Sequence, residues 1–356
     1  MSAAFQHHHI IGIGRSGTTL LQSLLNAHPD IWAGPEDYFI PFFYQAWKNK
    51  TEFTPQDLQR LDAFHKAFGI LQPYVGFTYD SDALLLSKPK NFNEVIRCSY
   101  NAFIDDLAPQ KEANVYVNKN PLHSLYLHEL QALNTESKFI WMLRDYRANI
   151  HSRIQSVHLK SSNVYFNAVR WVYFHKKIQR FQQKHPDKVQ VIRYEDLVHS
   201  PQNQIEEILA FLKTDTGYDL PNLLLPYQGN YKEAVKTSYQ GMKRMEKRFG
   251  DLAQPIHTNT IDKWKNGLNE HQIRIAEVIC GKHGKFHGYE PTTHWKPMQW
   301  SSIHCIAFFA KGYVFALLIK DGIFNRLPIH LKVNYFVNWV AKIDQKRKKN
   351  VDTRTA

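Results

Sequence analysis

Short apolar segments of strand length recur along the chain, and each ends in polar residues. They are HHHIIGIG from His7, VYVNKNP from Val115, FIWMLRD from Phe139 and VQVIRYEDL from Val189. Between them, apolar residues recur at helical spacing, as in TTLLQSLLNAH after Gly17 and ANIHSRIQSVH after Arg147. Strands that alternate with helices predict an α/β fold, in which a parallel sheet is flanked by helices on both faces.

Two more helices have recognisable ends. Ser200 is a suitable N-cap, Pro201 suits the first helical position, and the apolar residues that follow share one face. A second helix is predicted from about Glu270 to Cys280, with Gly281 placed to end it. The segment 51–106 is expected to mix helix and loop, and it carries no motif that indicates a function.

The C-terminal segment has a different pattern. The stretch SIHCIAFFAKGYVFALLI is apolar, but it is interrupted at Lys311 and is short for a membrane span. Together with the basic run Lys346–Lys349, segment 301–349 has the character of helices that lie on anionic lipid. The alternative is that these helices pack on the core and the basic tail is solvated. We therefore divide the chain into a main domain, 1–295, and a helical C-terminal extension, 296–356.

Composition and charge limit the classes of partner. Hydrophobic residues make up 43% of the 356 residues, which suffices for the core of one large domain. The net charge of +13 attracts polyanions, anionic membranes and multiply charged nucleotides. Because Lys and Arg interleave with acidic residues along most of the chain, the pattern does not favour specific nucleic-acid binding.

The cysteines and the N-terminal residues bear on the compartment and on metals. Cys98, Cys280 and Cys305 are odd in number and lack C-x-x-C spacing, so neither a disulfide framework nor a thiolate metal site is indicated. The start of the chain lacks the features of a secretory signal. We expect a cytoplasmic location, with peripheral membrane contact as an open alternative, and we place His7–His9 in the first strand rather than in a metal site.

The segment Gly12 to Thr19, GIGRSGTT, follows a predicted strand and opens a predicted helix. Its two glycines have the spacing of the phosphate-binding motif G-x-x-x-x-G-K-[ST], in which backbone N–H groups and a helix N-terminus surround an anion. The lysine position is occupied by Thr18, however, and Arg15 lies inside the loop. A sulfuryl group carries one charge fewer than a phosphoryl group. A donor with a single 5'-phosphate bearing sulfate can therefore be held by amides, hydroxyls and one arginine, with no metal required.

The segment RSGTTLLQSLLNAHPD, with Glu36 shortly after it, resembles the 5'-phosphosulfate-binding motif of sulfotransferases that use 3'-phosphoadenosine 5'-phosphosulfate (PAPS). The similarity is greatest to the branch with protein-tyrosine sulfotransferases and their bacterial relatives, and it extends over roughly residues 8 to 291. It implies a P-loop-like parallel sheet, PAPS as co-substrate and 3',5'-bisphosphoadenosine as product. The donor's 5' end would be bound by Arg15, Ser16, Gly17, Thr18 and Thr19.

A second segment, FIWMLRDYRANIHSRIQS, matches the family's RD-x-R-x-x-x-x-S pattern. The resemblance implies that Arg144 and Ser152 bind the 3'-phosphate, for which arginine is a natural partner. Taken alone, this segment favours a salt bridge from Arg144 to Asp145 or a helix-capping role for Arg144. Ser156 stands where the tyrosine-sulfotransferase pattern has another arginine, and whether Arg153 replaces that arginine is open.

Two weaker correspondences lie further along the chain. Tyr194, in VIRYEDLV, falls where the relatives place a tyrosine that contacts the donor, and its alternative role is a core aromatic at a strand end. Lys263, in IDKWKNGL, aligns with a family S-K-W element whose lysine contacts the donor. Its alternative role is that of an ordinary exposed lysine.

Sulfuryl transfer needs a base for the acceptor proton and a positive charge beside the departing phosphate. By resemblance, Glu36 in GPEDYF is the base and Lys119 in VNKNP stabilises the leaving group, although Asn120 replaces the family's aspartate. A surface carboxylate and a strand-end lysine are the alternative interpretations. His28 and His123 are rival bases, since histidine suits proton transfer near neutral pH.

The sequence thus predicts an enzyme that transfers the sulfuryl group of PAPS to a hydroxyl or amine. Two rival hypotheses remain: a P-loop kinase or NTPase, which Thr18 disfavours, and a non-catalytic membrane-surface protein on the same fold. Acceptor pockets are built from variable loops. Tyrosyl peptide, carbohydrate, lipid and small alcohol therefore stay open as acceptors.

Overall fold

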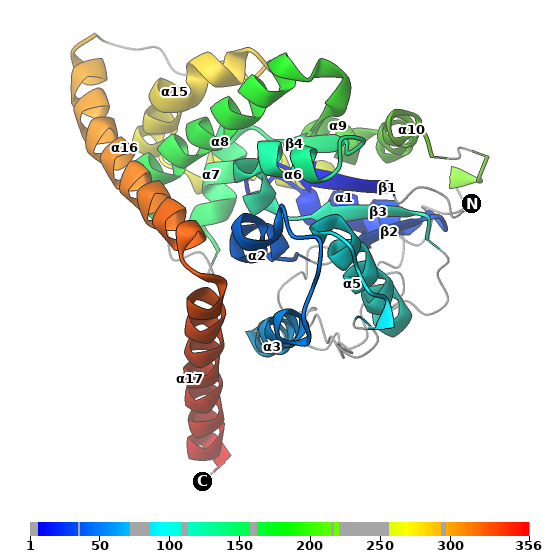
Figure 1. Ribbon diagram of the computed structural model, residues 1–356. Helices are drawn as coiled ribbons and strands as arrows, with labels where there is room; N and C mark the ends of the chain where they lie inside the picture. Colours follow the sequence, from blue (N-terminus) through cyan, green and yellow to red (C-terminus); the bar gives the residue numbers. More distant parts are fainter. Residues whose placement is uncertain are drawn as a thin grey trace.

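Five parallel strands form one sheet at the centre of the molecule (Figure 1). The computed structural model describes residues 6–34, 36–71, 84, 86–107, 113–156, 162–214, 217–220, 256–292 and 297–355. The strands run in the order β2-β3-β1-β4-β5. Their bounds are β1 (Gln6–Ile11), β2 (Ile31–Gly34), β3 (Val115–Lys119), β4 (Phe139–Leu143) and β5 (Val189–Arg193).

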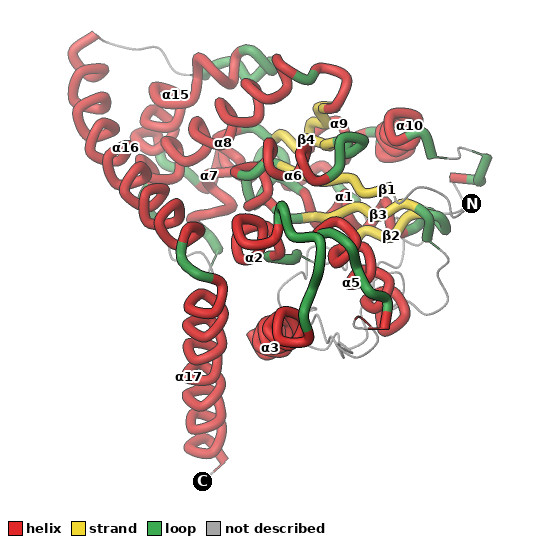
Figure 2. Tube along the Cα trace, viewed as in Figure 1, coloured by secondary structure: helices red, strands yellow, loops and turns green. Residues whose placement is uncertain are grey.

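Helices cover both faces of this sheet, as Figure 2 also shows. The helices of the described chain are α1 (Thr18–Asn26), α2 (Phe39–Trp47), α3 (Pro55–Leu71), α5 (Phe92–Leu107), α6 (Leu127–Leu133), α7 (Tyr146–Ile154), α8 (Val164–Lys184), α9 (Tyr194–His199), α10 (Pro201–Leu212), α14 (Lys263–Gly267), α15 (Glu270–Lys285), α16 (Pro297–Arg326) and α17 (Ile329–Thr355). The described residues also form the short 3₁₀ helices η1 (Pro121–Leu125), η2 (Pro186–Lys188) and η5 (Thr258–Thr260).

Alternate residues of the central strands enter two separate cores. Phe139, Trp141 and Leu143 of β4 pack with α2, α5 and α8 on one face, whereas Ile140 and Met142 pack with α1, α9 and α10 on the other. Every residue of β3 and β4 is buried. This two-sided burial explains why β4 is a continuous apolar run and why β3 is apolar without alternation from Val115 to Val117.

The α/β fold class and the four strands expected from the sequence are confirmed. β2 was not expected, because IWAG is a four-residue segment with no alternation to mark it. It is a strand because it pairs in parallel with β3, from Ile31 opposite Val115 to Gly34 opposite Asn118. Tertiary pairing, rather than local pattern, fixes its structure.

The predicted end of α15 at Gly281 is wrong. The helix begins with a capping box between Asn269 and Gln272 and continues to Lys285. Gly281 lies inside the helix, and the left-handed glycine is Gly288, at φ +80°. At α10 the first helical residue is Pro201, as expected, but Ser200 makes no side-chain cap hydrogen bond.

α16 continues without a break through Lys311, where the sequence had indicated an interruption. It packs along α8 through Ala307 and Val314, against Val169 (Figure 1). Within the described chain, the part of α16 from Ser302 to Arg326 is long and apolar enough to cross a membrane by length and composition, since a stretch of 18 residues in it has a mean hydropathy of 1.8. That finding corrects the expectation of a stretch too short for a span.

A buried lysine holds the junction between α16 and α17. The Lys332 side chain is 1% exposed, and its Nζ donates to the carbonyl oxygens of Asn325 and Pro41, each at 3.3 Å. Asn325 lies in the last turn of α16, where carbonyl groups lack helical partners. Lys332 therefore ties the end of α16 to α2.

Burial lowers the pKa of Lys332 from 10.5 to about 8. Between these values the unfolded chain holds a proton that the folded chain has lost, so the free energy of unfolding should rise with pH over this interval. We expect the Lys332→Met variant to show a shallower rise than the wild type in urea unfolding at pH 8 and pH 10. Parallel curves for the two proteins would contradict the assignment.

Candidate active site

The loop between β1 and α1 is shaped by its glycines. Gly12 has φ +135° and Gly17 has φ +88°, and a Cβ at either would collide with a neighbour, the Met142 carbonyl oxygen or the Tyr194 ring. Arg15 also has a positive φ, 77°, which is uncommon for a residue with a side chain. Gly17 is the N-cap of α1 and offers no side-chain cap. No side-chain cap therefore accepts hydrogen bonds from the first N–H groups of α1. These groups are available to bind an anion.

The second motif lies directly against this loop. Nε of Arg15 donates to Oγ of Ser152 at 3.0 Å. Nδ2 of Asn149, on the same helix, α7, donates to the Gly14 carbonyl at 3.1 Å and to Oγ of Ser16 at 3.0 Å. The structure therefore brings together two segments that are about 130 residues apart, as the sequence predicted. The sequence analysis did not predict that Asn149 contacts the loop. Its position three residues before Ser152, on the same helix, is the only sequence feature that indicates this contact.

Arg144, at the end of β4, connects the loop to a distant part of the chain. Its guanidinium donates to the carbonyl oxygens of Arg15, at 3.1 Å, and of Thr260, at 2.9 Å. It also lies 4.2 Å from the centre of the Tyr194 ring, whose hydroxyl is 2.6 Å from Oγ1 of Thr260. Nε of Arg144 is buried and has no hydrogen-bond partner among the described residues.

The suggested salt bridge between Arg144 and Asp145 is not what the structure shows. The Asp145 carboxylate instead caps α7 and pairs with Arg147, with Oδ2 at 2.7 Å from Nη2. Arg147 also pairs with Glu277 at 2.9 Å, which anchors α7 to α15. Arg144 therefore interacts with the loop and with Tyr194 rather than with Asp145.

On the other side of the loop, Lys119 and Glu36 form an ion pair. Nζ of Lys119 lies 2.6 Å from Oε1 of Glu36, and the two side chains are 7% and 30% exposed. Lys119 is the last residue of β3, and Glu36 follows β2. The lysine of the pair is thus buried, whereas the carboxylate is partly exposed to solvent.

Each of the five strands places one predicted group at its carboxyl end. In the order of the sheet these are Glu36 after β2, Lys119 on β3, the loop after β1, Arg144 after β4 and Tyr194 after β5. The carboxyl edge of a parallel sheet is where α/β proteins bind their ligands. The predicted groups therefore form one continuous row.

Comparison with known proteins identifies the family to which this row belongs. Residues 9–218 match the sulfotransferase family. The chain belongs to that family. A putative protein-tyrosine sulfotransferase of Caenorhabditis briggsae is 31% identical over 76% of this chain and 84% of its own length. Protein-tyrosine sulfotransferase 1 of Danio rerio is 24% identical over 79% of this chain and 71% of its own length.

A solved structure supports the fold of this sulfotransferase. The sulfotransferase domain from the Synechococcus PCC 7002 olefin synthase is 19% identical and superposes with a TM-score of 0.50, over 78% of this chain and 97% of that domain. The predicted family and fold class are thus confirmed. The family match ends at residue 218, so α15, α16 and α17 lie outside it.

Positive charge gathers beside the phosphate loop of the sulfotransferase. Burial, with the charges of Arg144 and Lys263, lowers the pKa of His151 on α7. Burial, with Arg170 and Arg15, lowers the pKa of Arg153 to about 10. Lys263 is exposed at the start of α14, and Arg153 rather than Ser156 adds a cation near the loop. Such a field suits a donor with several negative charges.

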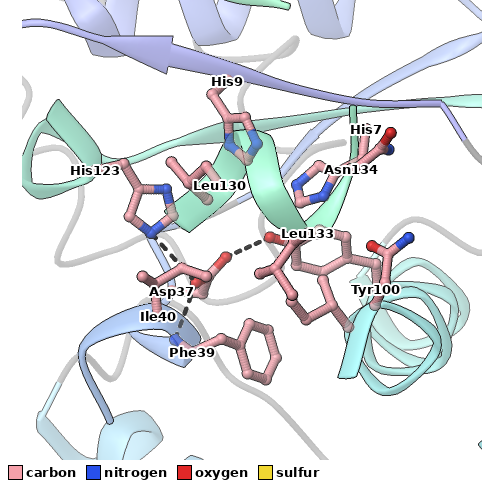
Figure 3. A pocket seen from close by; sticks show the side chains of 12 residues that line it. His7, His9, Asp37, Phe39, Ile40, Tyr100, His123, Leu130, Leu133 and Asn134 are labelled. Atoms are coloured by element: carbon pink, nitrogen blue, oxygen red, sulfur yellow. Dashed lines mark hydrogen bonds and ion pairs between the residues drawn. The ribbon is translucent and has the colours of Figure 1, made fainter. Parts of the chain in front are cut away.

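Two asparagines flank Lys119 and hold the chain that carries Glu36. The Asp37 side chain accepts hydrogen bonds from Asn118 and from Tyr100, the second of which Figure 3 shows. The Asp37 carbonyl oxygen accepts a hydrogen bond from Asn120. Asp37 is 4% exposed, and burial raises its pKa to about 7 against the hydrogen bonds from Tyr100 and Phe39. Asn120 thus donates a hydrogen bond to the Asp37 carbonyl oxygen, which an aspartate at this position would repel. The asparagine that replaces the family's aspartate therefore has a structural role.

The histidines considered as bases are buried. His123 and His28 are each 1% exposed, and burial lowers the pKa of His123 to about 3. His123 lies 3.7 Å from Asp37 and lines a small cavity with His7 and His9 (Figure 3). Nδ1 of His28 accepts the Asp30 N–H at 3.2 Å, in a turn. Among the described residues, no group of three or more side chains is arranged to hold a metal ion.

Proposed function

We propose that this sulfotransferase transfers the sulfuryl group of PAPS to a hydroxyl or amine acceptor and releases 3',5'-bisphosphoadenosine. The observation that carries the proposal is the row of groups along the carboxyl edge of the sheet, from Glu36 to Tyr194. The row has a base and a cation at one end, an anion-binding loop in the middle and an arginine stacked on tyrosine at the other. A donor charged at both ends matches this order.

The donor is bound along the loop and the end of β4. Backbone N–H groups of the loop and of the first turn of α1 hold the 5'-phosphosulfate. Ser16 is fully buried, with its hydroxyl turned to Asn149, so it acts through its backbone. Arg144 and Ser152 hold the 3'-phosphate, with Tyr194 and Lys263 beside them. A guanidinium has five N–H donors, and the two recorded hydrogen bonds of Arg144 use one on Nη1 and one on Nη2, so each of these nitrogens has a second N–H for a phosphate.

The chemistry takes place at the Glu36 end. Glu36 accepts the proton of the acceptor group as the acceptor oxygen or nitrogen forms a bond to sulfur. The bond between sulfur and the 5'-phosphate oxygen breaks, and Lys119 stabilises the negative charge that collects on that oxygen. The recorded ion pair uses Oε1 of Glu36, so Oε2 is the oxygen offered to the acceptor.

A ligand-dependent melting scan separates this function from a kinase or NTPase. We expect 3',5'-bisphosphoadenosine at about 100 times its Kd to raise the Tm by roughly 5 °C without Mg²⁺, and ATP to raise it far less. The 3'-phosphate provides the difference, because only the first ligand can engage Arg144 through it. Preferential stabilisation by ATP with Mg²⁺ would contradict the proposal.

The acceptor class needs a direct assay. The names of the curated relatives make a tyrosyl peptide the first acceptor to test, with carbohydrates, lipids and small alcohols as the comparison set. Mass spectrometry of a cell extract incubated with protein and PAPS detects a product that is heavier by one sulfuryl group. A non-catalytic protein on this fold would give no such product.

A further inference from the structure

One face of α16 is apolar and has no protein partner within the described chain. Phe308, Phe315, Ile319 and Ile323 are between 48% and 71% exposed, and Phe309 beside them is 76% exposed. Their spacing of seven and four residues places the first four on one side of the helix. Exposed large apolar side chains in a continuous stripe of this kind mark an interaction surface.

A different face of α16 holds the helix against the body of the protein. Ala307 and Val314 are buried against Val169 of α8, with Leu318 packed beside them. Each lies one residue before a member of the exposed stripe, which is an offset of roughly 100° around the helix. Only 17% of the apolar window of α16 is buried, and that part is the strip facing α8. Figure 1 shows α16 along the outer edge of the molecule.

This attachment favours a helix that lies in the plane of a membrane over one that crosses it. A spanning orientation would require α16 to leave α8 and to expose the buried strip and Val169 to solvent or lipid. It would also place Lys311 in the hydrocarbon region, with Lys320 and Asp321 at its edge, and a charged side chain is costly there. An in-plane orientation requires neither change.

The charges on α16 are arranged for an anionic surface. Lys311 and Lys320 are exposed and lie on the two sides of the apolar stripe. The one acidic residue of the helix, Asp321, is electrostatically coupled to Arg170 of α8 and so belongs to the body side. Long lysine side chains beside an apolar stripe can reach lipid headgroups.

The same charges argue against a second copy of the chain as the occupant of the stripe. A symmetric contact between two copies would bring the lysines of both stripes together, on chains that each carry a net charge of +13. Like charges at a contact oppose association. A bilayer with anionic headgroups instead satisfies both the apolar stripe and its basic borders.

We propose that α16 seats this sulfotransferase on anionic lipid bilayers, with the stripe of Phe308, Phe315, Ile319 and Ile323 inserted at the boundary between headgroups and acyl chains. The sequence continues the basic character into α17 with the run Lys346–Lys349. Binding therefore combines apolar insertion with attraction to negative headgroups. The proposal is independent of the roles assigned to the active-site residues.

Vesicle sedimentation of the full-length protein tests this surface. We expect the wild type to bind vesicles of phosphatidylcholine with 30% phosphatidylglycerol at least about tenfold more strongly than phosphatidylcholine alone. We expect the affinity for these vesicles to fall at least about tenfold in the Phe308→Ser, Phe315→Ser, Ile319→Ser triple variant. The Lys311→Glu, Lys320→Glu variant should lose mainly the preference for phosphatidylglycerol. Equal binding by wild type and triple variant, or no binding by either, would overturn the proposal.

Three controls distinguish the competing explanations. Leu86→Ser removes another highly exposed apolar side chain, far from α16 in sequence, and should bind vesicles as the wild type does. Alkaline carbonate should release the bound protein, since retention would indicate a spanning helix. A wild type that is dimeric in gel filtration, and that the triple variant converts to a monomer without any change in vesicle binding, would assign the stripe to a second copy. The melting response to 3',5'-bisphosphoadenosine, which uses no residue of α16, reports that each variant is folded.

Discussion

Replacing Glu36 by glutamine is expected to lower kcat for sulfuryl transfer by about 10²- to 10⁴-fold, the usual effect of removing a general base. The amide has nearly the shape of the carboxylate and can still accept a hydrogen bond from Lys119, but it does not take up the acceptor proton. Because Glu36 follows β2 and the proposed donor site lies at the ends of β1 and β4, the KM for PAPS should change little. Initial rates with labelled PAPS and an acceptor extract measure both quantities.

The chain offers a closely matched control for this variant. Glu270 forms an ion pair with Arg274 at 2.6 Å, the same distance as the pair between Glu36 and Lys119, and lies on the surface of α15. Glu270→Gln should leave transfer unchanged. A Glu36→Gln enzyme as fast as the wild type would remove Glu36 from the proposed mechanism.

Replacing Arg144 by glutamine is expected to weaken the binding of 3',5'-bisphosphoadenosine by about 10- to 150-fold. This loss corresponds to the roughly 1.5–3 kcal/mol that hydrogen bonds to a charged group contribute. Arg144 also donates hydrogen bonds to the carbonyl oxygens of Arg15 and Thr260. The variant should therefore bind every ligand of the loop somewhat more weakly. The decisive quantity is therefore the ratio of affinities for 3',5'-bisphosphoadenosine and for AMP, which lacks the 3'-phosphate. Calorimetric titration of both ligands gives this ratio.

A contact with the 3'-phosphate predicts that the ratio falls in the Arg144 variant. If Arg144 only holds the loop, both affinities should fall equally and the ratio should stay constant. Arg274→Gln removes a partly buried arginine of α15 whose recorded partner is Glu270, and it should change neither affinity. The ratio thus separates ligand contact from positioning within one experiment.

Much of the fold could be predicted because buried parallel strands are long apolar runs. β4 is the clearest example, since all of its residues are apolar and buried. β2 escaped prediction because its four residues become a strand only by pairing with β3. The end of α15 was misplaced because Gly281 packs beside Pro291 in a helix that tertiary contacts maintain. Local signals fail where a distant contact decides the structure.

The candidate site shows the same division. Arg15, Arg144 and Ser152 could be found because each belongs to a motif with fixed spacing, and the structure places them in contact. Asn149 and Asn118 could not be found, because their partners, Ser16 and Asp37, lie far away in sequence. The sequence therefore indicated the groups that we propose contact the donor better than the amides that hold neighbouring segments in place.

The dependence of Arg144 and Tyr194 on Thr260 has a consequence for synthesis on the ribosome. All five strands are complete at Arg193, yet the partner of both side chains arrives about 70 residues later. At 5–20 residues per second, the nascent chain spends roughly 3 to 14 s with a finished sheet and an unfinished donor end. A chain released before residue 260 would keep the sheet and its phosphate loop but would lack the backbone carbonyl that orients Arg144.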